Sequence, residues 1–209
     1  MQISLAEESF VIMKQYSQRI TSLLALASLF FVSLANAHVG VGETQGFLSG
    51  LTHPFSGFDH LAAMIAVGLW AAQLGGRAVW LVPLSFVSAM ALGGILSMFA
   101  VFIPFIEGGI TFSLLVLGLL IAAAIRLPIL ASTILVGIFA VFHGYAHGAE
   151  MPQNVDALTY ATGFVMATAF LHLSGIGLAV IANNHSHTQW LRFSGAAVVV
   201  CGVASLIGQ

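Results

Sequence analysis

The feature that most constrains this chain is the recurrence of apolar stretches of about 20 residues along almost its whole length. Hydrophobic residues make up 59% of the sequence, and charged residues make up only 6%. A helix needs about 20 apolar residues to cross a bilayer, whereas a membrane β-barrel would show short alternating segments. The sequence therefore predicts an all-α polytopic membrane protein and excludes an ordinary soluble domain.

Short connections divide the apolar sequence into six predicted transmembrane helices. Because each connection is short, neighbouring helices are predicted to run antiparallel and to form one domain over residues 38–209. Many of the 22 glycines lie inside the apolar stretches, where small residues let membrane helices approach closely. The predicted spans are 51–72, 79–103, 109–125, 127–148, 158–182 and 190–207.

Residues 1–37 have the pattern of a cleavable secretory signal peptide. A basic n-region and an apolar h-region precede residues 35–37, which match the A-x-A cleavage pattern. Met13 is an alternative start to Met1, because the acidic residues between them fit poorly ahead of such a signal. The other interpretation of this stretch is an uncleaved first membrane helix.

The charges that follow the predicted signal separate to opposite ends of the predicted spans. If His38 lies outside the cell, every later basic residue falls at an inside end, and four acidic residues fall at outside ends. This agrees with the positive-inside rule. The chain is thus predicted to lie in a bacterial inner membrane, with the N-terminus of the mature chain outside. The basic residues are Arg77, Arg126 and Arg192. The acidic residues at outside ends are Glu43, Glu107, Glu150 and Asp156, of which Glu107 is expected in a loop.

His53, Asp59 and His60 stand at the mouth of the first predicted span. An ionised aspartate inside a membrane helix costs about 2.5–3.5 kcal/mol on insertion scales, so it indicates function by default. The two histidines share one face if the segment is helical, and Pro54 is compatible with a helix start. Alternatively, Gly57 breaks the helix and gives an irregular segment that lines a cavity.

His143, His147 and Glu150 form a second cluster at the end of the fourth predicted span. Their i, i+4, i+7 spacing places all three on one face of a helix. Two imidazoles one turn apart can share a metal ion, and the carboxylate can complete the site. Both clusters fall in the outer halves of their spans, so one site between these spans is geometrically possible. The alternative is a structural role, as polar contacts between membrane helices.

Four further histidines are weaker candidates. His38 would be the new N-terminus after cleavage, where its amine and imidazole can chelate a divalent ion, or it is an ordinary first residue. His172 is either a deeper station on an ion path or a histidine bonded to a neighbouring carbonyl. His185 and His187 could bind and release metal on the inside, but an ordinary solvated loop with no metal-binding role is the favoured interpretation.

The two main clusters resemble the signature motifs of the HupE/UreJ family of nickel/cobalt permeases. The pattern His-Pro-x-x-Gly-x-Asp-His begins at His53, and Phe-His-Gly-x-Ala-His-Gly-x-Glu runs from Phe142 to Glu150. A stretch around Thr168 and His172 is similar to the third motif of the family. The resemblance covers essentially everything after the signal. It implies transport of Ni²⁺ or Co²⁺ into the cell rather than an enzyme, with no tightly bound cofactor.

Ligand chemistry agrees with part of this implication, since imidazole and carboxylate without thiolate suit nickel and cobalt but also zinc and iron. The sequence predicts a secondary transporter that moves the ion into the cytoplasm through a site in the outer half of the bundle. The alternative is an intramembrane metal-dependent hydrolase that uses the HxxxH pair, and a haem-binding subunit is a third class. The expected partners are the metal ion and membrane lipid, with no nucleic acid, and oligomerisation is left open. The candidate metal ligands are His38, His53, Asp59, His60, His143, His147, Glu150 and His172.

Overall fold

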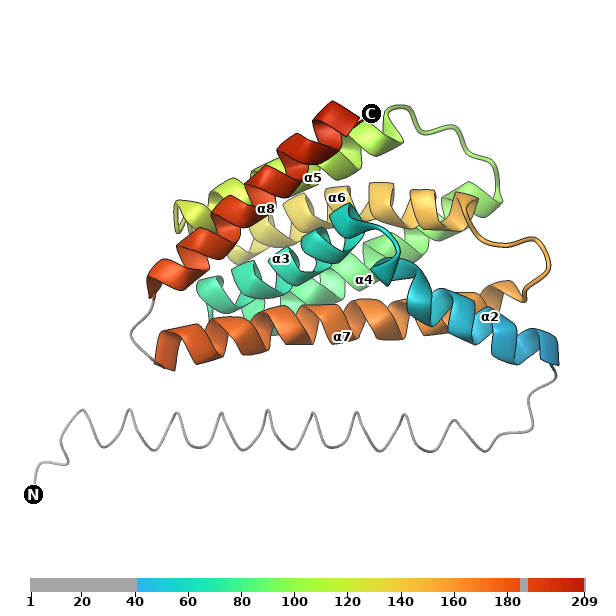
Figure 1. Cartoon of the computed structure of the whole chain (residues 1–209), viewed down its shortest axis with the longest axis horizontal. Helices are drawn as coiled ribbons and strands as arrows, with labels where there is room; N and C mark the ends of the chain where they lie inside the picture. The colour runs from blue at the N-terminus through green and yellow to red at the C-terminus, as the bar shows by residue number, and fades with distance from the viewer. Residues whose placement is uncertain (1–40, 185–187, 209) are drawn as a thin grey trace, which may run out of the picture. The chain divides into compact units, whose positions relative to one another are not determined.

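A computed structural model describes residues 41–184 and 188–208 of the chain. Within these ranges all regular structure is helical, which confirms the predicted all-α class (Figure 1). The predicted signal peptide, His38, His185 and His187 lie outside the described residues. The elements are η2 (His53–Phe55), a 3-10 helix, and the α-helices α2 (Val41–Thr52), α3 (Phe58–Leu74), α4 (Ala78–Met98), α5 (Ile106–Ala122), α6 (Ile129–Ala149), α7 (Ala157–Asn184) and α8 (Thr188–Gly208).

Four of these helices, α4, α6, α7 and α8, are each long and apolar enough to cross a bilayer. The stretches Gln45–Phe55 and Phe58–Leu74 pass the same test only as a pair, and they are bent by 79° relative to each other. α5 is apolar but has only 17 residues, or about 26 Å of helix. The described chain is therefore a multi-pass helical membrane protein, and the full set of six spans stays a prediction.

The first predicted span differs most from the structure, because it is broken rather than continuous. α2 ends at Thr52, the 3-10 helix η2 follows, and α3 begins after Gly57, whose backbone is extended (φ −105°, ψ 117°). His53 and His60 therefore do not share one face of a single helix. The predicted break at Gly57 is confirmed, but the segment before it is a 3-10 helix rather than irregular. A Cβ at Gly57 would come within 3.0 Å of the Asp59 and His60 side chains, so glycine leaves room for the turn.

Glu107 also lies elsewhere than predicted. It was expected in a loop, but α5 begins at Ile106 and includes Glu107 in its first turn. α4 ends at Met98, five residues before the predicted end of its span. Positive φ values at Ala100 (51°) and Phe105 (58°) flank Pro104 and interrupt the helical backbone. The carboxylate of Glu107 then stands at a helix N-terminus, where the helix dipole favours negative charge.

The helices pack in closely spaced pairs: α4 lies along α6, α5 along α8, and α7 along both α2 and α3. Glycines of both partners make this approach possible. Gly144 of α6 lies against the backbone of Met90 in α4, and Gly93 of α4 lies against the backbone of Val141 in α6, with no room for a Cβ at either glycine. The predicted role of glycine in close helix contacts is thus confirmed.

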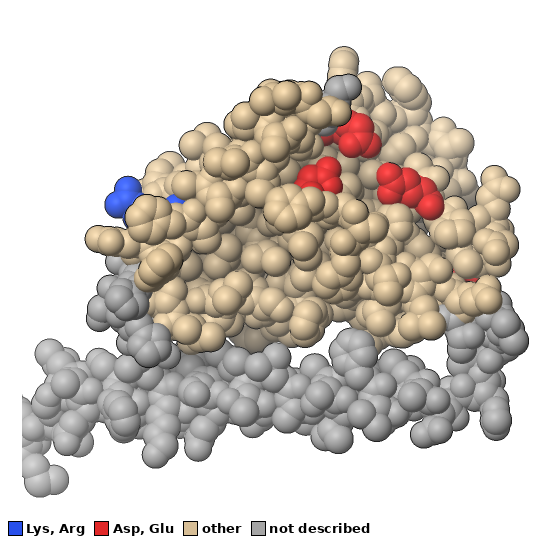
Figure 2. All heavy atoms as spheres, viewed as in Figure 1, with Lys and Arg blue, Asp and Glu red and all other residues tan. Residues whose placement is uncertain are grey.

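The surface of the bundle is rich in large apolar side chains, as expected of helices that face lipid. Leu84 is 61% exposed, Leu119 57% and Ile134 54%. Figure 2 shows few charged side chains on the visible face; the basic ones lie at the left edge, and the acidic ones lie well away from them. Arg77 follows the end of α3, and Arg126 precedes the start of α6. These arginines therefore mark one end of the two helices that carry the histidine clusters.

Candidate metal centre

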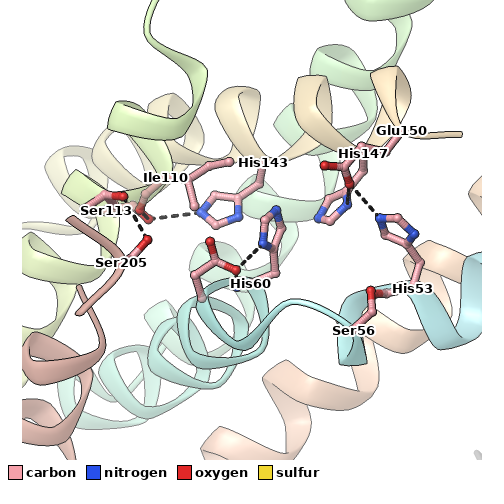
Figure 3. A network of polar contacts seen from close by, with 11 residues as sticks. His53, Ser56, His60, Ile110, Ser113, His143, His147, Glu150 and Ser205 are labelled. Atoms are coloured by element: carbon pink, nitrogen blue, oxygen red, sulfur yellow. Dashed lines mark hydrogen bonds and ion pairs between the residues drawn. The ribbon is translucent and has the colours of Figure 1, made fainter. Parts of the chain in front are cut away.

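α3 and α6 bring the two predicted histidine clusters together at the ends opposite the arginines. His60 is the third residue of α3, and His143 and His147 lie in the last two turns of α6. All three side chains are buried. The His60 ring centroid lies 4.2 Å from that of His147 and 5.2 Å from that of His143 (Figure 3).

The side-chain nitrogen and oxygen atoms form two overlapping groups in which three residues can face one ion. In the inner group, ligand atoms of His60, His143 and His147 lie within 4.8 Å of one another. In the outer group, ligand atoms of His53, His147 and Glu150 do so as well. Two imidazole nitrogens on one ion are separated by up to roughly 4.2 Å, because each metal–nitrogen bond is about 2.0–2.1 Å. Small side-chain movements would therefore suffice for either group.

The two groups differ in their access to the surface. Every member of the inner group is buried. In the outer group, the Glu150 side chain is 52% exposed and the His53 side chain 21% exposed. His147 belongs to both groups, so it connects the exposed cluster to the buried one.

Asp59 lies behind His60 and is in neither group. Its Oδ1 accepts a hydrogen bond from the backbone N–H of His60 at 2.8 Å and lies 2.7 Å from Nδ1 of the same residue. An ionised carboxylate only accepts, so Nδ1 of His60 carries the proton and Nε2 carries the lone pair. Nε2 is buried and has no hydrogen-bond partner among the described residues. Asp59 therefore orients His60, as carboxylates that accept a hydrogen bond from a metal-binding histidine do.

Glu150 links the members of the outer group. Its Oε2 lies 3.0 Å from Nε2 of His53 and 3.8 Å from Nδ1 of His147. The rings of the two histidines are 4.8 Å apart and edge to face. Within the described chain neither ring nitrogen of His147 has a hydrogen-bond partner. A polar ring that is buried without a partner is costly, which favours a role in binding.

His172 lies apart from both groups. It is buried in α7, next to the ring of Phe86 from α4. The centroid of the Phe86 ring lies 5.0 Å from that of His172 and 5.7 Å from that of His143. Neither ring nitrogen of His172 has a hydrogen-bond partner in the part of the chain described, so the carbonyl-bonded alternative is wrong. Phe86 is thus a site neighbour that sequence reasoning missed, because an aromatic residue in an apolar helix carries no distinguishing signal.

Two further features adjoin the histidines. The Oγ atom of Ser113 in α5 lies 3.0 Å from Nε2 of His143, and only its isolated position in an apolar run could have singled it out in the sequence.

A cavity of about 380 Å³ opens between α4, α6 and α7, with His147 in its wall. Apart from His147, the cavity is mostly lined by apolar residues, among them Met90, Met98, Met151, Phe164 and Val165.

Comparisons with known proteins concern nearly the whole chain. The model of a family described as "HupE / UreJ protein" matches residues 25–205. Protein HupE of Rhizobium leguminosarum bv. viciae is 45% identical over 194 residues, which cover 93% of this chain and 100% of that protein. No solved structure matches the chain.

Proposed function

Because the chain belongs to the HupE/UreJ family, we propose that it is a secondary transporter that moves Ni²⁺ or Co²⁺ across the membrane into the cytoplasm. The family is related to nickel and cobalt transport. The observation that carries the proposal is the pair of overlapping ligand groups that share His147 inside a bundle of apolar helices. Imidazoles and a carboxylate, without thiolates, form a donor set that suits these borderline ions.

The ion first meets the outer group, in this proposal. Glu150 is exposed and negatively charged, so it raises the local concentration of cations near His53. The ion exchanges water for ligands there and then moves to the inner group while His147 stays bound. A ligand common to both positions means that the ion is never stripped of all protein contacts in the apolar interior, where desolvation of a charge is most costly.

The direction of transport follows from the proposed topology. We place the bent pair of helices and α5 in the membrane with the four long helices, which gives six spans in the inner membrane with the mature N-terminus outside. The arginines then lie inside, in agreement with the positive-inside rule, and the histidine groups lie toward the outside. An inside-negative potential favours the entry of a divalent cation by roughly 4.6 kcal/mol per 100 mV.

The onward path leads past Phe86 to His172. The Phe86 ring is fully buried and contacts both His143 and His172. Because the Phe86 ring neighbours both histidines, we expect an ion that passes from the inner group to His172 to move past this ring. The proposed path therefore consists of an exposed position, a buried position and a deeper histidine that shares an aromatic neighbour with the buried position.

Uptake into proteoliposomes tests the proposal. Purified protein is reconstituted, an inside-negative potential is imposed, and the uptake of labelled Ni²⁺ and Co²⁺ is compared between the wild type and His60→Ala. Saturable uptake that the variant loses supports a permease and ranks the two metals. If the wild-type protein binds metal stoichiometrically but transports neither ion, the permease is excluded.

A metal-dependent hydrolase is the second candidate, and the cavity beside His147 is the observation that favours it. A hydrolase needs a metal with an open coordination position and space for a substrate, and an apolar cavity next to a ligand supplies that space. Such an enzyme would cleave hydrophobic peptide or ester substrates when loaded with metal, in detergent and without a membrane potential. Metal-dependent cleavage that His147→Ala abolishes, without uptake by the wild type, would establish this function instead.

A further inference from the structure

A buried serine stands directly behind one member of the inner group. Ser113 of α5 is fully buried, and its Oγ lies 3.0 Å from Nε2 of His143 in α6. The same Oγ lies 2.6 Å from the backbone carbonyl oxygen of Ile110, one turn earlier in its own helix. Figure 3 shows the His143 ring between Ser113 on one side and His60 on the other.

The two contacts determine where the protons are. A serine hydroxyl has one proton, and a carbonyl oxygen only accepts, so the hydroxyl of Ser113 donates to Ile110. Its oxygen must then accept the second hydrogen bond, which requires a proton on Nε2 of His143. The lone pair of the neutral imidazole is therefore on Nδ1, which is buried and has no hydrogen-bond partner in the described residues.

We propose that Ser113 is a positioning residue that fixes the tautomer and orientation of His143, so that Nδ1 is the atom offered to the metal. This inference rests on the proposed transport of Ni²⁺ or Co²⁺ through the inner group. It assigns the opposite nitrogens to two histidines in one group, because Asp59 holds the proton on Nδ1 of His60. Each ring then has one nitrogen held by an acceptor and the other ready to bind.

The competing explanation is that Ser113 only satisfies its hydroxyl within its own helix, as buried serines commonly do. Ser132 of α6 provides the matched control. It is fully buried, and its Oγ donates to the carbonyl oxygen of Pro128 at 3.1 Å, with that of Leu127 at 3.4 Å. No contact with a histidine is found for Ser132 among the described residues. Both hydroxyls are fully buried and bonded to nearby backbone carbonyl oxygens, but of the two only Ser113 contacts an imidazole.

The test measures the tautomer and the affinity separately in the purified full-length protein. Apo protein labelled with ¹⁵N in its histidine rings gives the tautomer of His143, whose signals are identified by their loss in His143→Gln. Co²⁺ titration then gives the dissociation constants of the wild type, Ser113→Ala and Ser132→Ala. We expect a proton on Nε2 of His143 in the wild type and in Ser132→Ala, and a mixture of tautomers in Ser113→Ala. We expect the dissociation constant of Ser113→Ala to rise by about 10–100-fold and that of Ser132→Ala to stay unchanged.

Three results would overturn the inference: a proton on Nδ1 of His143 in the wild type, a normal affinity in Ser113→Ala, or an equal loss in both serine variants. The proposed function fails by a different result, which is the absence of Co²⁺ binding and uptake by the wild type. In that case the ¹⁵N spectrum of the apo protein still decides whether Ser113 sets the tautomer. The two failures are therefore distinguishable.

Discussion

The outer and inner groups contain the same kind of side chain in opposite surroundings. In the outer group the exposed Glu150 lies 3.0 Å from His53, and both residues are within reach of solvent. In the inner group three histidines are buried, and the carboxylate of Asp59 lies behind His60 rather than beside the ligand nitrogens. In the proposed transporter, exposure would suit the outer group to capture ions, and burial would suit the inner group to select them.

The location of the negative charge explains this division. A carboxylate at the surface attracts any cation and loses water at little cost. It therefore raises the rate of ion binding more than the selectivity for one metal ion over another. A carboxylate behind a buried histidine raises the basicity of that ligand and fixes its orientation without occupying the coordination sphere. Substitutions in the two groups are therefore expected to have different kinetic effects, and His147 should show both.

The largest effect is expected for His147→Ala, because His147 is the residue that both groups share. Removing it leaves two ligands in each group and eliminates the connection between them. We expect Ni²⁺ uptake into proteoliposomes to fall to the level of empty vesicles, while the protein still inserts and elutes as a single species. Ser132→Ala is the control, and residual saturable uptake in His147→Ala would show that one group suffices.

Asp59→Asn should have the next largest effect. An amide can present an N–H as well as an oxygen to His60, so the proton is no longer held on Nδ1 and the lone pair on Nε2 is lost for part of the time. We expect metal affinity to fall by about 10–100-fold. Isothermal titration with Co²⁺ measures this change, and an unaltered affinity would mean that Asp59 does not orient the inner group.

Glu150→Gln should have a smaller effect on uptake, confined to the initial binding of the ion at the outer group. The neutral amide keeps the shape of the side chain but removes the attraction for cations, so the KM for uptake should rise by about tenfold with little change in kcat. The difference between variant and wild type should also shrink at high salt, because salt screens exposed charges. Rate measurements at low and high ionic strength check both points. A fall in kcat at saturating metal would instead place Glu150 in the rate-limiting step.

The smallest effect is expected for His185→Ala. This residue lies outside the described residues, in the predicted inside loop, and far along the chain from either group. We expect the uptake rate and the metal affinity of His185→Ala to match those of the wild type. A large loss of uptake with normal binding would reveal a function in metal release on the inside, which the comparison of outer and inner groups does not include.

The spacing of residues predicted that the α6 side chains lie together, but not that His143 and Glu150 belong to different ligand groups. His143, His147 and Glu150 lie in or directly after one uninterrupted helix, where i, i+4 and i+7 positions share a face by geometry alone. The α3 half was harder, because Pro54 favours a helix start and Gly57 favours a break. The break at Gly57 is compatible with the close packing of α2 and α3 on α7, which no local pattern reveals.

The residues that support the site could not be predicted from the sequence. Ser113 is an isolated serine in an apolar run, and its importance depends on α5 lying beside α6. Phe86 likewise contacts both His143 and His172 only because α4 packs against both α6 and α7. Sequence spacing describes one helix at a time, whereas these contacts arise between helices that the sequence does not place next to each other.

The stoichiometry of bound metal tests the central claim most directly, because two groups that share His147 cannot both be fully coordinated at once. Purified protein is equilibrated with a range of Ni²⁺ concentrations by dialysis, and bound nickel is measured by mass spectrometry for the wild type and His147→Ala. Because the groups share His147, we expect saturation at one tightly bound ion per chain in the wild type and the loss of tight binding in the variant. Two tightly bound ions per chain, or one that persists in His147→Ala, would contradict it.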